Sequence, residues 1–117
     1  DIASVAQLAT ECDVMYIPTD NTAASYTETI ANVVLPAKVP AVVGEEGICK
    51  GCGVATLTIS YYDLGYKTGE MATQILKGEA DISQMPIEYA NASKLYNADM
   101  CQELGITPPD GYTAIEA

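Results

Sequence analysis

Short apolar runs along the chain predict buried strands. Each run is rich in Val, Ile, Ala or Met, and most of them end at or beside a proline, glycine or serine. The first two runs have no polar alternation, which is typical of strands covered on both faces of a sheet. The predicted strands cover residues 14–17, 41–43, 54–60 and 85–90, with a further candidate at 93–97.

Apolar residues at helical spacing predict helices between these strands. In the second helix, Tyr26, Ile30 and Val33 recur three and four residues apart, and Pro36 is expected to end it. The segment that joins the second and third strands is rich in glycine, and we expect a loop there. The predicted helices cover residues 2–9, 22–35 and 61–77 and the segment between Asn97 and Gly105, and the loop covers 44–53.

This alternation of helices and strands predicts an α/β fold. The expected architecture is a layered sheet of mostly parallel strands with flanking helices. In open sheets of this class, ligands bind in the crevice at the carboxyl ends of the strands. A functional site is therefore expected where the strands end.

The composition excludes several classes of function. The chain has 117 residues, which suits one domain, and its formal net charge of −11 disfavours binding to nucleic acid or to anionic membranes. It has no histidine, so a Ser-His or Cys-His nucleophile pair within the chain is impossible. No apolar run approaches the ~20 residues that span a bilayer.

Polar side chains follow three of the predicted strands. They form the triplets Thr19-Asp20-Asn21, Glu45-Glu46-Gly47 and Ser60-Tyr61-Tyr62. Carboxylates at these positions suit a cationic or hydroxyl-bearing ligand, and a tyrosine suits an apolar or aromatic group. The alternative is that Asp20 and Asn21 cap a helix while the tyrosines only pack. Because all three strand ends are polar, we expect a ligand site.

Cys49 and Cys52 form a C-x-x-C pair in the glycine-rich segment. A zinc site needs four ligands, and Cys12 and Cys101 stand alone far along the chain. A redox pair is favoured by a helix N-terminus, whereas this pair follows two glutamates, whose charge disfavours a thiolate. A small disulfide, or two idle thiols, is therefore the preferred interpretation, and no metal or other cofactor is expected.

Three stretches together resemble a known family. They read VMYIPTDNTAAS, VPAVVGEEG and GVATLTISYYDLGYKTGEMATQILKGE. In order and spacing they are similar to the C-terminal half of an ABC-transporter substrate-binding protein. The resemblance runs from about Ser4 to Pro108 and points to the type I periplasmic-binding fold, in the group that includes tryptophan- and aromatic-amino-acid-type binding lipoproteins.

The resemblance implies a two-lobed receptor and no enzyme. Two α/β lobes close on a small ligand and deliver it to an ABC permease in the membrane, outside the cytoplasm, in the periplasm or anchored by lipid at the cell surface. By this resemblance, residues 1–53 belong to the C-terminal ligand-binding lobe. Residues 54–90 form a hinge-crossing strand, a helix and a strand of the other lobe, and residues 91–117 form a terminal strand, helix and tail.

The resemblance also implies that the three polar triplets contact the ligand. Asp20, Glu45 or Glu46 would pair with the α-ammonium of an amino acid, and Tyr61 or Tyr62 would cover its side chain. Two alternatives of other kinds stay open. Sugar or nucleoside receptors share the fold, and a small thiol or metal protein would be built on Cys49 and Cys52. A carboxylate-pair enzyme has no further support.

The chain begins at Asp1 with neither an initiator methionine nor a signal peptide, so a mature or excised fragment is expected. Half of a two-lobed receptor would expose apolar faces. We therefore expect the fragment to self-associate as a homodimer by exchanging residues 54–90, with glycines in the preceding loop as the hinge, and to bind ligand weakly.

Overall fold

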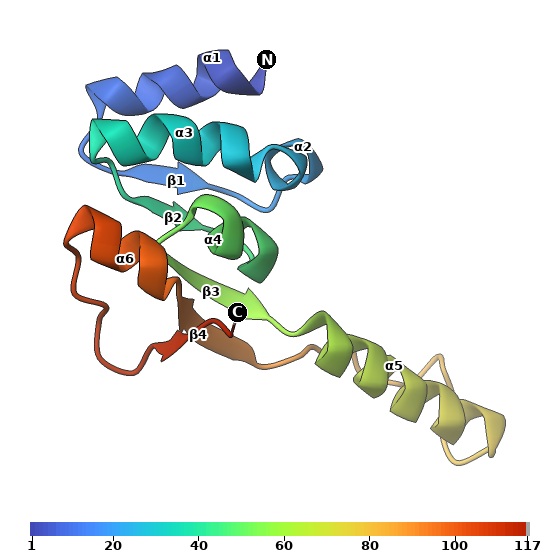
Figure 1. Ribbon diagram of the computed structural model, residues 1–117. Helices are drawn as coiled ribbons and strands as arrows, with labels where there is room; N and C mark the ends of the chain where they lie inside the picture. Colours follow the sequence, from blue (N-terminus) through green and yellow to red (C-terminus); the bar gives the residue numbers. More distant parts are fainter. Residues whose placement is uncertain (117) are drawn as a thin grey trace. The chain divides into compact units, whose positions relative to one another are not determined.

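A five-stranded sheet organises the computed structural model, which describes residues 1–116 (Figure 1). The strand order follows the sequence, β1-β2-β3-β4-β5, and the pairs β1-β2, β2-β3 and β4-β5 are parallel. The predicted α/β fold with mostly parallel strands is confirmed. The strands are β1 (Met15–Ile17), β2 (Ala41–Val43), β3 (Ala55–Ile59), β4 (Ala92–Tyr96) and β5 (Thr113–Ala114).

Helices fill the connections between the strands. Several begin at a side chain that accepts a hydrogen bond from a backbone N–H of the first turn, as polar N-cap residues do. The helices are α1 (Ile2–Gln7), the 3-10 helix η1 (Leu8–Glu11), α2 (Asn21–Ser25), α3 (Thr27–Ala37), α4 (Glu46–Cys52), α5 (Tyr61–Leu76) and α6 (Ala98–Leu104).

The helix expected over residues 22–35 differs from the prediction at both ends. Tyr26 leaves helical geometry, with φ −128° and ψ 30°, and separates α2 from α3. Pro36 does not end α3, which continues to Ala37 and stops at Lys38 in the left-handed region, with φ 57°. A proline in the last turn removes one backbone hydrogen bond near the helix end, where the helix tolerates the loss.

The glycine-rich segment forms a helix, α4, so the predicted loop is wrong. Glu45 caps it, and its carboxylate accepts hydrogen bonds from the N–H groups of Gly47 and Ile48. A Cβ on Gly51 would overlap the Thr27 side chain, and one on Gly53 would lie 2.8 Å from a methyl carbon of Val43. These two glycines therefore allow α4 to pack closely against α3 and β2.

The strand predicted over residues 85–90 is also wrong. The segment has no regular structure, and Ile87 is 95% exposed and Tyr89 80% exposed. Pro86 lacks the N–H that a sheet ladder needs. The candidate at 93–97 is instead the strand β4, and the short strand β5 was not predicted.

The core lies on one face of the sheet. Ile17, Val43 and Thr56 are neighbours by register and are all buried, in contact with a cluster that includes Ile30 of α3 and Ile48 of α4. On the opposite face, side chains of the same three strands are exposed, and these are Tyr16, Val42 and Leu57. The described residues cover one face, and the exposed apolar surface expected from the sequence lies on the other.

The chain divides into two compact units. The first comprises residues 1–58 and the residues from 94 onward, and the second is Ile59–Ser93. The second unit holds α5, whose Leu64, Met71 and Ile75 are half-buried, and it contains no fully buried residue. Thr68 and Ala72 on the same helix are exposed. The second unit therefore has no core of its own.

Candidate functional site

The carboxyl ends of β1 and β2 lie against each other in the first unit. The N–H of Gly44 donates to the carbonyl of Ile17 at 2.9 Å. A Cβ on Gly44 would lie 2.7 Å from the backbone nitrogen of Thr19 and 2.8 Å from its Oγ1. Glycine is therefore needed at this position, and the loop that carries Thr19 and Asp20 touches the loop that carries Glu45.

Asp20 caps α2 and is exposed. Its Oδ1 accepts a hydrogen bond from the N–H of Ala23 at 2.8 Å, which is the capping role considered from the sequence. Within residues 1–116, no hydrogen bond or ion pair engages its second oxygen. A carboxylate has about four acceptor positions, so capping leaves Asp20 able to accept from a ligand. Its neighbours Thr19 and Asn21 are exposed.

Glu45 and Glu46 differ in what they do, although they are adjacent. Both oxygens of Glu45 accept from α4, one from the N–H of Gly47 at 2.9 Å and the other from that of Ile48. Glu46 is exposed, and no described residue pairs with its carboxylate. Glu45 therefore holds the start of α4, while Glu46 places a negative charge at the end of β2.

Ser60, Tyr61 and Tyr62 belong to the second unit. The Oγ of Ser60 accepts from the N–H of Asp63 at 3.1 Å and caps α5. Tyr61 and Tyr62 begin this helix and are strongly exposed, Tyr62 by 80%. In the described chain neither ring packs into a core, so the packing role considered for them is absent.

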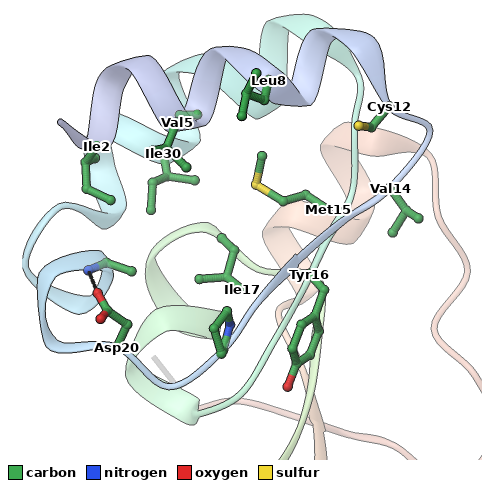
Figure 2. A pocket seen from close by; sticks show the side chains of 13 residues that line it. Ile2, Val5, Leu8, Cys12, Val14, Met15, Tyr16, Ile17, Asp20 and Ile30 are labelled. Carbon is green, nitrogen blue, oxygen red and sulfur yellow. Dashed lines mark hydrogen bonds between the residues drawn. The ribbon is translucent and has the colours of Figure 1, made fainter.

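A pocket of about 450 Å³ lies beside β1 in the first unit (Figure 2). Its walls come from α1, η1, β1, the start of α2 and α3, and its one acidic side chain is Asp20. Val5 and Leu8 lie three residues apart, at helical spacing, but this pattern does not predict that they line a cavity. Further lining residues include Ile2, Met15, Tyr16 and Ile30.

All four cysteines are free, so of the two interpretations kept for Cys49 and Cys52, a small disulfide or two idle thiols, this structure has free thiols. Cys49 and Cys52 are buried on α4. Burial raises the pKa of Cys49 to about 12 and that of Cys52 to about 11, and the Cys101 and Cys52 thiols add to the shift at Cys49. Over the described range, no three acidic or cysteine side chains are placed to hold a metal ion.

Comparison with known proteins shows what the chain is similar to. The family model described as ABC transporter substrate binding protein matches residues 1–115. A curated tyrosine-binding protein from Clostridioides difficile is 33% identical over 84 residues, which is 72% of this chain and 24% of that protein.

Three solved structures share the fold. A ligand-free, open substrate-binding protein with adhesive properties from Clostridium difficile has a TM-score of 0.79 and 31% identity, covering 98% of this chain and 40% of that one. An ABC domain in complex with L-Trp from Streptococcus pneumoniae has a TM-score of 0.78 and 32% identity, covering 97% of this chain and 41% of that one. A conserved domain protein from Vibrio cholerae has a TM-score of 0.79 and 27% identity, covering 97% of this chain and 40% of that one.

The chain thus spans about a quarter of the curated relative and about two-fifths of the solved chains. Among residues 1–116, no helix combines the length and apolar character needed to cross a membrane.

Proposed function

Because the chain belongs to the ABC transporter substrate-binding protein family, we propose that it supplies part of an amino-acid site in an importer's receptor. The observation that carries this proposal is the contact between the ends of β1 and β2, where Gly44, two residues before Glu46, lies against Thr19, one residue before Asp20. An ammonium group is the natural partner for carboxylates at such an edge. The family is one of substrate-binding proteins, and one of the similar structures is named as a substrate-binding protein, so no enzymatic activity is proposed.

An aromatic amino acid is the ligand class that we propose. One relative is named as tyrosine-binding, and one similar structure contains L-Trp. Tyr61 and Tyr62 offer exposed aromatic rings for the ligand's side chain, and Ser60, Thr19, Asn21 and Gly47 offer hydrogen-bonding groups. Five lysines are the only basic residues, and there is no arginine, so the ligand's carboxylate is expected to need groups from the rest of a longer receptor.

Asp20 is the residue that we propose for the ammonium. Capping engages one of its oxygens and leaves the other open, and its position at the pocket beside β1 places an acidic group next to an apolar surface. Glu45 is already bound at both oxygens by α4. Glu46 is the second candidate, because its carboxylate is exposed and does not cap.

The lobe assignment remains a proposal. We place residues 1–53 in the C-terminal lobe, 54–90 in the other lobe and 91–117 in the terminal strand, helix and tail. The second compact unit begins after residue 58 and ends at residue 93, which supports a chain that passes from one lobe to the other and back. The same proposal includes three further points. The receptor works outside the cytoplasm, it delivers its ligand to an ABC permease, and the isolated chain forms a homodimer.

Calorimetry on a receptor that contains this chain tests the ligand class. The panel is L-tyrosine, L-tryptophan, L-leucine, ribose and adenosine, with a receptor carrying Asp20→Asn as the matched control. We expect an aromatic amino acid to bind most tightly in the unchanged protein. Tighter binding of ribose or adenosine would overturn the amino-acid proposal and leave the family unaffected.

A further inference from the structure

One edge of the sheet is open in the first unit, and an apolar pocket runs along it. In the described chain β1 stands at the end of the strand order and pairs only with β2. The pocket of about 450 Å³ is lined by Met15 and Ile17 from one face of β1 and by Val14 and Tyr16 from the other (Figure 2). Because residues of both faces line it, the pocket follows the edge of the strand.

The backbone of Tyr16 faces this open edge. The N–H of Met15 donates to the carbonyl of Pro40 at 2.9 Å, and the carbonyl of Ile17 accepts from the N–H of Gly44 at 2.9 Å. Met15 and Ile17 therefore turn backbone groups toward β2, and the residue between them turns its N–H and carbonyl to the opposite side of the strand. These groups of Tyr16 are the kind that an edge strand offers to a further strand.

The helices indicate the side from which the chain enters β1. α3 joins β1 to β2 and α4 joins β2 to β3, and both pack on the core face of the sheet. α1 packs on α3, and its Ala6 belongs to the same buried cluster, so α1 also lies on that face (Figure 1). Parallel crossovers are almost always right-handed, so successive crossovers with helices on one face advance in one direction across the sheet. A strand before α1 would therefore lie beyond β1, on the side away from β2.

We propose that the open edge of β1 and the pocket beside it hold a further parallel strand, supplied by the part of a longer receptor that precedes Asp1. This inference rests on the proposed role as part of a receptor, but not on which ligand the receptor binds. The chain covers 40 to 41% of the similar solved chains, so a receptor of their length contains enough additional residues for such a strand.

The pocket also predicts the character of this strand. Among the described residues, Asp20 is the only charged side chain that lines the pocket, although the chain carries a net charge of −11. Val5 and Leu8 line it and are 55% and 58% exposed. We therefore expect apolar side chains on the face of the strand that covers them, as in sheets buried under helices. Parallel strands end at the same edge, so the carboxyl end of the strand would lie beside the loop that carries Asp20.

Amide hydrogen exchange tests the proposal without any ligand, so its outcome is independent of the ligand class. In a longer receptor that contains this chain, the Tyr16 amide should exchange within about tenfold of the Met15 amide, which pairs with β2 in either case. In the 117-residue chain alone, Tyr16 should exchange on the order of 100-fold faster than Met15. Fast exchange of Tyr16 in the receptor would overturn the proposal. Protection in the isolated chain that rises with its concentration would also overturn it, by assigning the edge to a second copy.

Val5→Asn gives a second test, by thermal unfolding. Val5 is more than half exposed in this chain, so the substitution should change the melting temperature of the isolated chain little. In the receptor the added strand would cover this position, and burial of an unpaired amide should lower the melting temperature by several degrees. Gln7→Asn is the matched control, because Gln7 is exposed on the same helix and does not line the pocket. Equal melting temperatures for the two receptor variants would contradict the proposal.

Discussion

At the scale of single residues, a polar side chain that follows a strand caps the next helix in three places. Asp20, Glu45 and Ser60 each accept backbone N–H groups from the first turn of the next helix. The N-terminus of a helix also carries partial positive charge, which stabilises an acidic side chain there. A change at these positions therefore alters folding and ligand contact together unless the replacement preserves the cap.

Asp20→Asn separates these two roles. Asn caps as well as Asp, so the melting temperature should stay nearly constant. Loss of the charged hydrogen bond should weaken amino-acid binding by about 1.5–3 kcal/mol. Calorimetry and thermal unfolding of the full receptor measure the two effects. Asp20→Ala is the control and should lower both, whereas unchanged affinity in Asp20→Asn would refute the contact.

The buried thiols predict a loss of stability at high pH under reducing conditions. Burial raises the pKa of Cys49 from 9.0 to about 12 and that of Cys52 from 9.0 to about 11, so folding favours the protonated thiols. This stabilisation is complete below pH 9 and disappears as the pH rises through the folded values. Between pH 9 and 11 the unfolding free energy should fall by about 2 kcal/mol per pH unit for the two thiols together.

Urea unfolding at a series of pH values measures this slope. A variant with Cys49→Ala and Cys52→Ala should show a shallower dependence over the same range, although it will be less stable at neutral pH because it leaves cavities. Equal slopes for the two proteins would show that the thiols do not titrate differently on folding.

At the scale of elements, α4 shows how close packing selects a sequence that does not look helical. Three glycines lie within or just after its seven residues, and its cap is a glutamate, which is not among the preferred N-cap residues. Local propensity therefore predicted a loop. The contact of Gly51 with Thr27 of α3 explains the glycine, but that contact joins residues 24 apart and is invisible in the local pattern.

Gly51→Ala should destabilise the protein, although alanine is the better helix former. Its Cβ would overlap Thr27, and overpacking of this kind costs about 1–3 kcal/mol. Gly69→Ala on α5 is the matched control, because no atom lies within 4 Å of the added carbon, and it should be neutral or stabilise by up to about 1 kcal/mol. Denaturant unfolding of both variants measures these changes in the free energy of unfolding. A stabilised Gly51→Ala would mean that α3 and α4 lie farther apart.

Much of the element pattern was predictable from local sequence. The apolar runs located β1, β2 and β3, and the capping residues Ser60 and Asn97 located the starts of α5 and α6. The predicted strand at 85–90 failed because an apolar run cannot show whether a pairing partner exists. The pocket beside β1 was missed for a related reason, since its walls come from separate elements.

At the scale of the whole molecule, apolar surface without cover is the dominant feature. Tyr16, Val42 and Leu57 lie exposed on one face of the sheet, and the second unit has no buried residue. Soluble chains usually cover apolar patches larger than a few hundred Å². Two occupants fit this surface, the remainder of a longer receptor or a second copy of the chain.

The isolated 117-residue chain should therefore associate, most simply as a homodimer that exchanges residues 54–90. Light scattering at micromolar concentration measures its mass. Leu57→Lys should weaken the association, because it places a charge on the uncovered face, whereas Glu103→Lys on α6 is a control on an already polar, exposed position. A monodisperse, well-folded monomer would show that these residues form a self-sufficient domain.

The link from Asn97 to the end of α4 has a consequence for the order in which the chain is made. A ribosome releases Cys49 and Cys52 some 50 residues before Asn97 and Cys101 emerge, so α4 has to wait for the side chain that fixes its end. Until Asn97 is present, the carbonyls of Cys49 and Lys50 lack the side-chain donor that pairs with them in the folded chain. Late completion of the C-terminal end of α4 is therefore the behaviour that this geometry predicts for newly synthesised chains.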